Sequence, residues 1–220
     1  MAIKTVDWLI RAGEERTTRF HTYDGDIVSA RGIFDLARVL PHAAVRKFQG
    51  RRPTIPWIPY PAIREIEKIL QPGSRVLEFG SGMSTIWLAR LGAYVDSRES
   101  DAAWFARVSS RLSGLDSVDV KLFQPEDPAY WQLGSAEAHS YDLVIVDGIA
   151  RSKCAATALT AVRLGGYIYL DNVDNAVHDG DYRGALDTLS RAAGVDHMTF
   201  LVGFPPGQLT VTKGVLLRMN

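Results

Sequence analysis

Cysteine is nearly absent from this chain of 220 residues, which contains only Cys154 and therefore forms no internal disulfide. Long apolar runs are absent too, since none approaches the roughly 18 residues that cross a bilayer. Charged residues also occupy the part of the N-terminus where a signal peptide would have its apolar core. We therefore expect a cytoplasmic protein with reduced thiols and no membrane partner.

Neither sign of charge is in excess, because 25 lysines and arginines balance 25 aspartates and glutamates. This balance provides no electrostatic basis for a nucleic-acid partner. Internal repeats and low-complexity segments are absent as well. What is present is 46% hydrophobic residues in a chain long enough to bury a sizeable core, which indicates a globular protein.

From Gly73 onward, short apolar segments alternate with amphipathic ones. Strands are expected at 75–79, 94–98, 118–123, 143–146 and 167–170, and helices at 84–91, 101–112, 154–164 and 182–193. Such repeated units with short connections predict a mostly parallel, doubly wound α/β sheet. The last two strands, 197–202 and 210–218, have no helix between them and should form an antiparallel hairpin. The sheet would then have seven strands.

Residues 1–60 precede this alternation and are expected to form a helical extension or lid, whereas residues 61–220 would form the main domain. Helices are expected at 5–16 and 33–48, and Pro41 should break or restart the second one. A proline-rich connector at 52–61 leads into a short helix at 62–70.

The sequence from Arg75 to Thr85, RVLEFGSGMST, predicts a buried strand, a glycine turn and the start of a helix. Gly80 and Gly82 permit a tight turn and a close approach of the backbone to a ligand. Ser81 and Ser84 are expected to cap the helix, whose free N–H groups favour a polar or anionic ligand.

The glycine turn does not match the dinucleotide pattern G-x-G-x-x-G, because Thr85 occupies the third glycine position. Glu78 precedes the turn, and Glu99 ends the next strand. The pattern E-x-G-x-G-x-S resembles motif I of class I S-adenosylmethionine-dependent methyltransferases, which have a Rossmann-like fold. The resemblance implies that the turn holds the methionine part of the cofactor and that Glu99 binds the ribose hydroxyls. The expected cofactor residues are Tyr60, Glu78, Gly80, Ser81, Gly82, Ser84, Glu99, Ser100 and Asp147.

A second group of polar residues follows the fourth and fifth strands: Asp147, Asp171 and Asn172. Neighbouring strands would bring these oxygen donors together, and such donors suit Mg²⁺, Mn²⁺ or Ca²⁺. Alternatively, Asn172 belongs to a strand-end turn and bonds its own backbone. The pattern resembles metal-dependent O-methyltransferases of the catechol and caffeoyl-CoA kind, in which these positions hold a divalent cation that binds the acceptor hydroxyls. The catalytic lysine of that group is replaced here by Ala150.

A closer resemblance is to small bacterial class I methyltransferases that share five motifs with residues 55–220. These motifs are W-x-x-Y-P, V-L-E-x-G-S-G-x-S-T, E-x-D-x-x-W, V-D-G-x-x-R-x-x-C and G-G-x-I-x-L-D-N. The resemblance implies a saccharide or natural-product hydroxyl as the acceptor. Asp147, Arg151 and His178 are the catalytic candidates, since a histidine titrates near neutral pH and suits a general base.

The sequence thus predicts an S-adenosylmethionine-dependent O-methyltransferase, assisted by Mg²⁺ or Mn²⁺ and acting on a small hydroxylated molecule. Two alternatives stay open, namely a metal-independent methyltransferase and a non-catalytic protein that binds the same cofactor. The N-terminal helical segment is expected to serve as a lid or as the contact of a homodimer.

Overall fold

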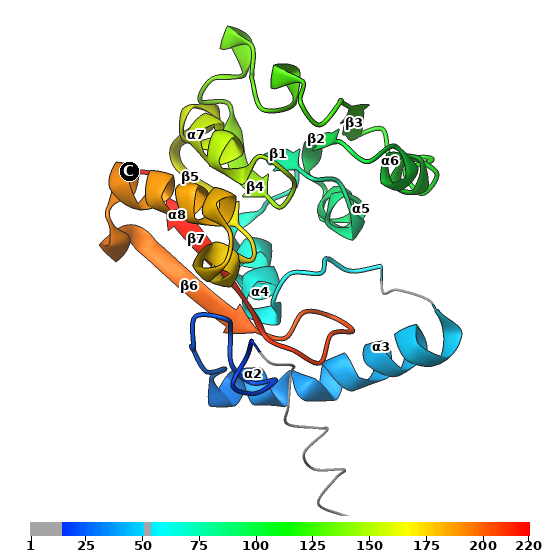
Figure 1. Ribbon diagram of the computed structural model, residues 1–220. Coiled ribbons are helices and arrows are strands. Elements are labelled where there is room, and N and C mark those ends of the chain that lie inside the picture. The colour runs from blue at the N-terminus through cyan, green and yellow to red at the C-terminus, as the bar shows by residue number, and fades with distance from the viewer. Residues whose placement is uncertain (1–14, 51–53) are drawn as a thin grey trace, which may run out of the picture.

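The computed structural model describes residues 15–50 and 54–220 and contains the expected seven-stranded sheet (Figure 1). The strand order is β3-β2-β1-β4-β5-β7-β6. Strands β1 to β5 are parallel, whereas β7 runs antiparallel to both β5 and β6, so the expected C-terminal hairpin is confirmed. The strands are β1 (Arg75–Phe79), β2 (Tyr94–Glu99), β3 (Val118–Leu122), β4 (Tyr141–Val146), β5 (Val162–Leu170), β6 (Met198–Gly203) and β7 (Thr212–Arg218).

Helices cover both faces of the sheet, as a doubly wound fold requires (Figure 1). They are α2 (Ala30–Phe34), α3 (Leu36–Gln49), α4 (Tyr60–Ile69), α5 (Met83–Arg90), α6 (Ala102–Ser109), α7 (Arg151–Ala161) and α8 (Gly180–Ala193). None of the helices in the described ranges is long and apolar enough to span a bilayer.

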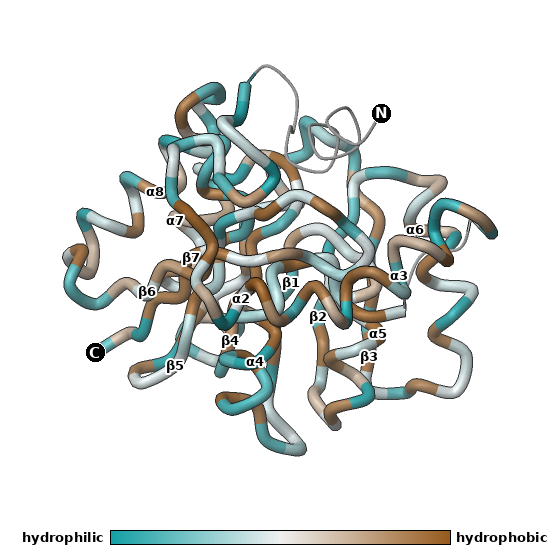
Figure 2. Tube along the Cα trace, turned by 90° about the horizontal axis from the view of Figure 1, so that it is seen from below, coloured by the Kyte–Doolittle hydropathy of each residue, from teal (hydrophilic) through white to brown (hydrophobic). Residues whose placement is uncertain are grey.

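The central strand β4 shows why the two faces are both apolar. Leu143 and Ile145 belong to the core cluster that includes α4, whereas Val144 and Val146 belong to the cluster that includes α7 and α8. Successive side chains of a strand point to opposite faces, so a strand covered on both sides is continuously hydrophobic. Figure 2 shows hydrophobic stretches running through the middle of the molecule. The carboxyl ends of the parallel strands are thereby held in fixed relative positions.

Helix α3 contradicts the expectation that Pro41 interrupts the helical segment at 33–48. Pro41 lies inside α3, and the break falls earlier, at Asp35 between α2 and α3. A proline removes one backbone donor and frees the carbonyl four residues earlier, here that of Ala37. Both Ala37 and Pro41 are exposed, so water can satisfy the freed carbonyl and the helix continues. The helix expected at 5–16 lies almost entirely outside the described residues.

The described part of the N-terminal segment, from Glu15 on, is bonded to β7 and to the short 3₁₀ helix Val173–Val177 that follows β5. The Asp174 carboxylate accepts the backbone N–H groups of Tyr23 (3.4 Å) and Lys213 (3.2 Å) and lies 3.5 Å from the Arg16 guanidinium. The Lys213 ammonium in turn pairs with Asp24 at 2.7 Å. The division of the chain at residue 60 stays a prediction, because these contacts join the segment to the main sheet.

Candidate functional site

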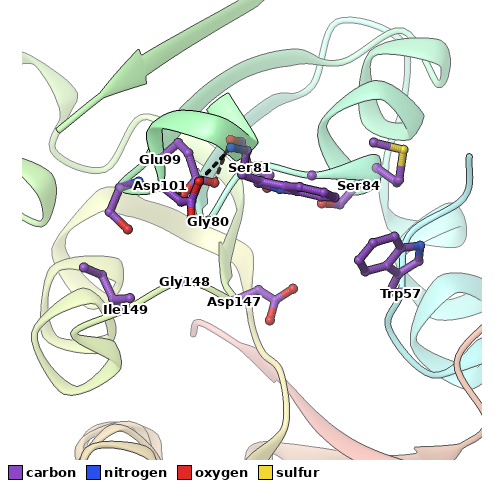
Figure 3. Close-up of a pocket in the computed structure, with 13 residues that line it drawn as sticks. Trp57, Gly80, Ser81, Ser84, Glu99, Asp101, Asp147, Gly148 and Ile149 are labelled. Atoms are coloured by element: carbon purple, nitrogen blue, oxygen red, sulfur yellow. Dashed lines mark hydrogen bonds between the residues drawn. The ribbon is translucent and has the colours of Figure 1, made fainter. Parts of the chain in front are cut away.

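A cavity of about 350 Å³ lies at the carboxyl ends of β1, β2 and β4 (Figure 3). In an open α/β sheet this is where ligands bind. The lining includes seven of the nine residues expected to bind the cofactor: Gly80, Ser81, Gly82, Ser84, Glu99, Ser100 and Asp147. It also includes six residues outside that set: Trp57, Met83, Asp101, Trp104, Gly148 and Ile149.

Two backbone turns meet at the floor of this cavity. Gly80 has a φ of +94°, and a Cβ built on it would lie 2.7 Å from both the nitrogen and the Cα of Gly148. A Cβ on Gly148 would in turn meet the Tyr130 hydroxyl oxygen at 2.0 Å. Glycine is therefore required at both positions, because the turn after β1 and the turn after β4 are in backbone contact.

We expect Gly80→Ala to lower the free energy of unfolding by roughly 2–4 kcal/mol, since backbone strain and overpacking act together. Gly73→Ala is the matched control, because Gly73 also has a positive φ (+89°) but nothing lies within 4 Å of its added Cβ. It should lose only about 1–2 kcal/mol. Urea unfolding measures both values. Equal losses would show that the contact with Gly148 contributes nothing.

The helix after the turn is not capped by serine, which corrects the expectation for Ser81 and Ser84. Gly82 is the N-cap residue, and the Thr85 hydroxyl accepts its backbone N–H at 2.8 Å. The Ser81 hydroxyl is engaged elsewhere, since it donates to the Glu99 carboxylate at 2.9 Å. Thr85, which rules out the dinucleotide pattern, thus has a structural role in this turn.

Glu78 lies beneath the turn, completely buried and not among the residues that line the cavity. Its Oε2 accepts the hydroxyls of Thr85 and Ser97, both at 2.6 Å, whereas Oε1 has no hydrogen-bond partner in the described part of the chain. Burial raises the pKa of this carboxyl to about 7, against the opposing effect of the hydroxyls. The unpaired oxygen leaves Glu78 able to accept one further donor, and its contact with a cofactor stays a prediction.

The raised pKa of Glu78 predicts a pH-dependent stability. Between its ordinary pKa and about 7, the folded protein holds a proton that the unfolded chain has released. The contribution of Glu78 to the free energy of unfolding is therefore present at low pH and is lost as the pH rises towards 7. Glu78→Gln has no carboxyl to titrate, so its stability should not show this pH dependence. The free energy of unfolding of Glu78→Gln minus that of wild type should therefore increase by an amount on the order of 3 kcal/mol from about pH 5 to about pH 8. Urea unfolding at both pH values tests this, with the exposed Glu67→Gln as control.

Glu99 organises the second side of the cavity. Its Oε1 accepts the backbone N–H groups of Ser100 (2.7 Å) and Asp101 (2.8 Å), and its Oε2 accepts the Ser81 hydroxyl (Figure 3). These bonds fix the carboxylate at the end of β2, where the resemblance places a ribose. Asp101 caps α6, because its Oδ1 accepts the Trp104 backbone N–H at 2.7 Å.

Two tryptophans form a wall that the cofactor prediction did not include. Trp104 donates its indole N–H to the Ser81 carbonyl at 2.6 Å, and its ring lies 5.5 Å from that of Trp57. The expected Tyr60 is instead buried in the hydrophobic core at the start of α4, and its N–H bonds the Phe204 carbonyl. The proline-rich connector contains two aromatic residues, Trp57 and Tyr60, and only the structure shows that Trp57 is the one that lines the cavity. Trp104 could have been found, since the Asp101 cap places it in the first turn of α6.

Arg151 joins the carboxyl ends of β4 and β5. Its guanidinium is buried and donates to the carbonyls of Gly148 (3.1 Å), Asp171 (2.6 Å) and Asp147 (3.1 Å), and also to the Asp147 carboxylate (3.0 Å). Every nitrogen of the guanidinium therefore has a partner within the protein. These bonds hold the Asp147 carboxylate in place, and a catalytic role for Arg151 itself stays a prediction.

The two aspartates differ in access. Asp147 has a side chain that is 33% exposed and points into the cavity (Figure 3), whereas Asp171 is buried and its Oδ1 accepts the Tyr169 hydroxyl at 2.6 Å. Burial raises the pKa of Asp147 although Arg151 opposes the rise, and Glu99 adds to it. Burial and then the charge of Asp147 raise the pKa of Asp171 well above its usual range. Asp147 is thus the acidic group of this pair that a ligand can reach.

The expected metal ligands are only partly assembled. Asp147 and Asp171 carry two negative charges, and Arg151 supplies one positive charge, so one charge is left for a proton or a further cation. Asn172 has a φ of +56°, and its backbone carbonyl accepts the Asn175 N–H at the start of a short 3₁₀ helix, so β5 is followed by a turn, although the Asn172 side chain does not cap that helix. No group of three histidine, cysteine or acidic residues converges within the described ranges, so an amide oxygen would have to complete the set.

His178 does not line the cavity. It is exposed at the end of the 3₁₀ helix Val173–Val177, and its ring lies 5.1 Å from that of Tyr23 in an edge-to-face arrangement. Its role as a general base stays a prediction, since the structure places it against the N-terminal segment.

A neighbouring cavity of about 480 Å³ shares Trp57, Met83 and Trp104 with the first one. Arg107 of α6 and Arg111, just after that helix, also line it, and none of its lining residues is acidic. The two cavities together offer room for a cofactor and a second molecule beside it.

No protein-family model and no curated protein sequence matches the chain. Solved structures with the same fold do match. The O-methyltransferase TomG of Streptomyces achromogenes, involved in tomaymycin synthesis and solved with S-adenosylmethionine, is 19% identical, with a TM-score of 0.58 over 87% of this chain and 97% of TomG. An O-methyltransferase of Bacillus cereus solved with S-adenosylhomocysteine is 17% identical, with a TM-score of 0.56 over 84% of this chain and 99% of that protein.

These similarities confirm the fold that the motifs predicted. The chain has the fold of class I S-adenosylmethionine-dependent methyltransferases, and its cavity lies where those motifs place the cofactor.

Proposed function

We propose that this protein is an S-adenosylmethionine-dependent O-methyltransferase that acts on a hydroxyl of a small molecule such as a saccharide or natural product. The observation that carries the proposal is the cavity in which the Gly80–Gly82 turn, the Glu99 carboxylate and the Asp147 carboxylate come together. The cofactor-bound structures with this fold support it.

The residues of the cavity divide between the two parts of the cofactor. The turn at Gly80–Gly82 would receive the methionine part, and Glu99 would accept the ribose hydroxyls. The indoles of Trp57 and Trp104 provide flat apolar surface for the remainder of the cofactor or for the acceptor.

Methyl transfer makes modest chemical demands on the protein. The acceptor oxygen attacks the methyl carbon, and the electron pair of the breaking carbon–sulfur bond returns to the sulfur, which leaves as a neutral thioether. Holding oxygen, carbon and sulfur in line is the main task, and such alignment supplies roughly 7–11 kcal/mol. The acceptor proton must also be taken up. Asp147 suits this role because it is accessible, its pKa is raised, and Arg151 fixes its orientation.

The proposal also includes a divalent cation bound beside the cofactor. Asp147, Asp171 and Asn172 would hold it, and the uncompensated negative charge beside Arg151 favours it. When bound, Mg²⁺ or Mn²⁺ would act as a Lewis acid that lowers the pKa of the acceptor hydroxyl. A proton on one of the two aspartates would compensate the same charge, which is the metal-independent alternative.

The test has two stages. Calorimetry with S-adenosylhomocysteine should show saturable binding with one site per chain, and absence of binding would refute the proposal. Formation of S-adenosylhomocysteine from S-adenosylmethionine is then followed with a panel of catechols, saccharides and phenolic natural products. Loss of turnover in EDTA and its return with Mn²⁺ would support the cation. Turnover unaffected by EDTA would leave the methyltransferase and remove the metal, whereas binding without any turnover would favour the non-catalytic alternative.

A further inference from the structure

Helix α3 has an apolar face that points to solvent. Its inner face includes the fully buried Val39, with Leu36 packed against the core. Its outer face consists only of apolar residues, all exposed: Ala37, Leu40, Pro41, Ala44, Val45 and Phe48. We call these six residues the outer stripe. A surface helix normally has polar residues on the side away from the core, so α3 is apolar on two sides.

Helix geometry makes the outer stripe continuous. The other members lie three, four, seven, eight and eleven residues after Ala37, and these offsets place them on one side of a helix. Leu40 is 54% exposed and Phe48 is 80% exposed. Asp35 joins α2 to α3 with helical backbone angles, so Ile33 and the 80% exposed Phe34 extend the same side. Figure 1 shows α3 running along the outside of the molecule, below α4.

The exposed apolar area is large for a monomer. A phenylalanine side chain contributes roughly 150–250 Å² when buried, so Phe34 and Phe48, each 80% exposed, alone expose about 250–400 Å². With the partly exposed Ile33, Leu40 and Val45, the surface reaches the upper part of the range of about 300–600 Å² found for the largest patches on typical monomers. It is comparable to the apolar part of the roughly 800 Å² that each partner buries in a stable complex, since about 56–65% of such an interface is non-polar.

The outer stripe can pack against a second copy of itself that runs in the opposite direction. If two α3 helices pack antiparallel about a two-fold axis between His42 and Ala43, Ala37 lies opposite the partner's Phe48, and Pro41 opposite the partner's Ala44. The largest member of the stripe thus meets one of the smallest, as interdigitated packing favours, and Leu40 lies opposite the partner's Val45. A two-fold axis closes the assembly, because each copy uses the same surface.

We propose that the outer stripe of α3 binds a second copy of this chain and forms a two-fold symmetric dimer. The charges at its edges predict how salt affects this dimer. Residues 36–50 include Arg38, Arg46 and Lys47 and no acidic residue. The two copies therefore bring positive charge together, and screening should strengthen the dimer as salt rises. Binding of the same helix to an anionic lipid surface would weaken as salt rises.

Sedimentation equilibrium of the full chain at low and high salt tests the proposal. We expect a dimer whose dissociation constant falls with salt. Leu40→Ser/Phe48→Ser should weaken it at least tenfold, as should Ala44→Arg, which places a charge at the centre of the stripe while keeping helix propensity. Leu164→Ser is the matched control, because Leu164 is 72% exposed on β5 and should leave the dimer unchanged. Circular dichroism and S-adenosylhomocysteine binding should be the same in all variants.

Several results would overturn the proposal. A wild-type chain that stays monomeric at every concentration would do so, as would a dimer that persists in both stripe variants. A monomer that binds phosphatidylglycerol vesicles, and releases them in high salt, would assign the stripe to a lipid surface. A monomer whose melting temperature falls in Leu40→Ser/Phe48→Ser, but not in Leu164→Ser, would assign it to residues 1–14 of the same chain.

Discussion

Glu99→Ala is expected to weaken S-adenosylhomocysteine binding by roughly 10- to 150-fold. Hydrogen bonds to a charged group contribute about 1.5–3 kcal/mol, and this carboxylate would supply the bonds to the ribose. The substitution also releases the Ser81 hydroxyl and the N–H groups of Ser100 and Asp101, which Glu99 now holds. Calorimetry with S-adenosylhomocysteine measures the change directly, and it needs no knowledge of the acceptor.

The control for Glu99→Ala is Glu126→Ala, which removes the same charge from an exposed loop outside the cavity. The dissociation constant of Glu126→Ala for S-adenosylhomocysteine should match that of wild type. Glu99→Gln separates two causes, because an amide still accepts hydrogen bonds but carries no charge. If Glu99→Ala binds as tightly as wild type, the cofactor does not occupy the cavity at the end of β2.

Asp147→Asn should slow methyl transfer by about 10²- to 10⁴-fold, the usual contribution of a general base. The amide has nearly the same size as the carboxylate and still accepts a hydrogen bond from Arg151, so the fold and the S-adenosylhomocysteine affinity should change little. The expected signature is a large loss in kcat at saturating cofactor, measured with the best acceptor found in the panel.

Asp187→Asn serves as the control, since Asp187 is exposed on α8 and away from the cavity. Its rate should equal the wild-type rate. An Asp147→Asn enzyme with full activity would move the proton acceptor to another group, and His178 would be the next to test. A variant that loses cofactor binding together with activity would instead make Asp147 a cofactor residue.

Most of the fold could be predicted from the sequence because its signals are local. The apolar run before Gly80 and the missing helix between the last two strands each have one physical interpretation, and the structure confirms both. The Asp101 cap is a local feature of the same kind, since the backbone N–H that it accepts lies only three residues further along the chain.

What could not be predicted depends on contacts between distant parts of the chain. Pro41 continues the helix because its freed carbonyl is exposed, and exposure is a tertiary property. Tyr60 and Trp57 are alike in sequence, and packing against Phe204 decides which one is buried. Arg151 could be recognised as a polar residue near the site, but its bond to the Asp171 carbonyl joins two strands whose pairing the residue alone does not reveal.

The ties between the N-terminal segment and Asp174 also set an order for folding during synthesis. Arg16 and Asp174 are 158 residues apart, and Asp24 and Lys213 are 189 residues apart. The segment is synthesised before every strand of the sheet, yet one of its anchors belongs to β7, which follows the other six strands in the sequence. Contacts of such long range form late, because the loop that they close must be ordered first. The nascent chain therefore carries the segment around Arg16 and Asp24 unanchored until β7 has been synthesised, and it anchors that segment only when the hairpin of β6 and β7 has completed the sheet.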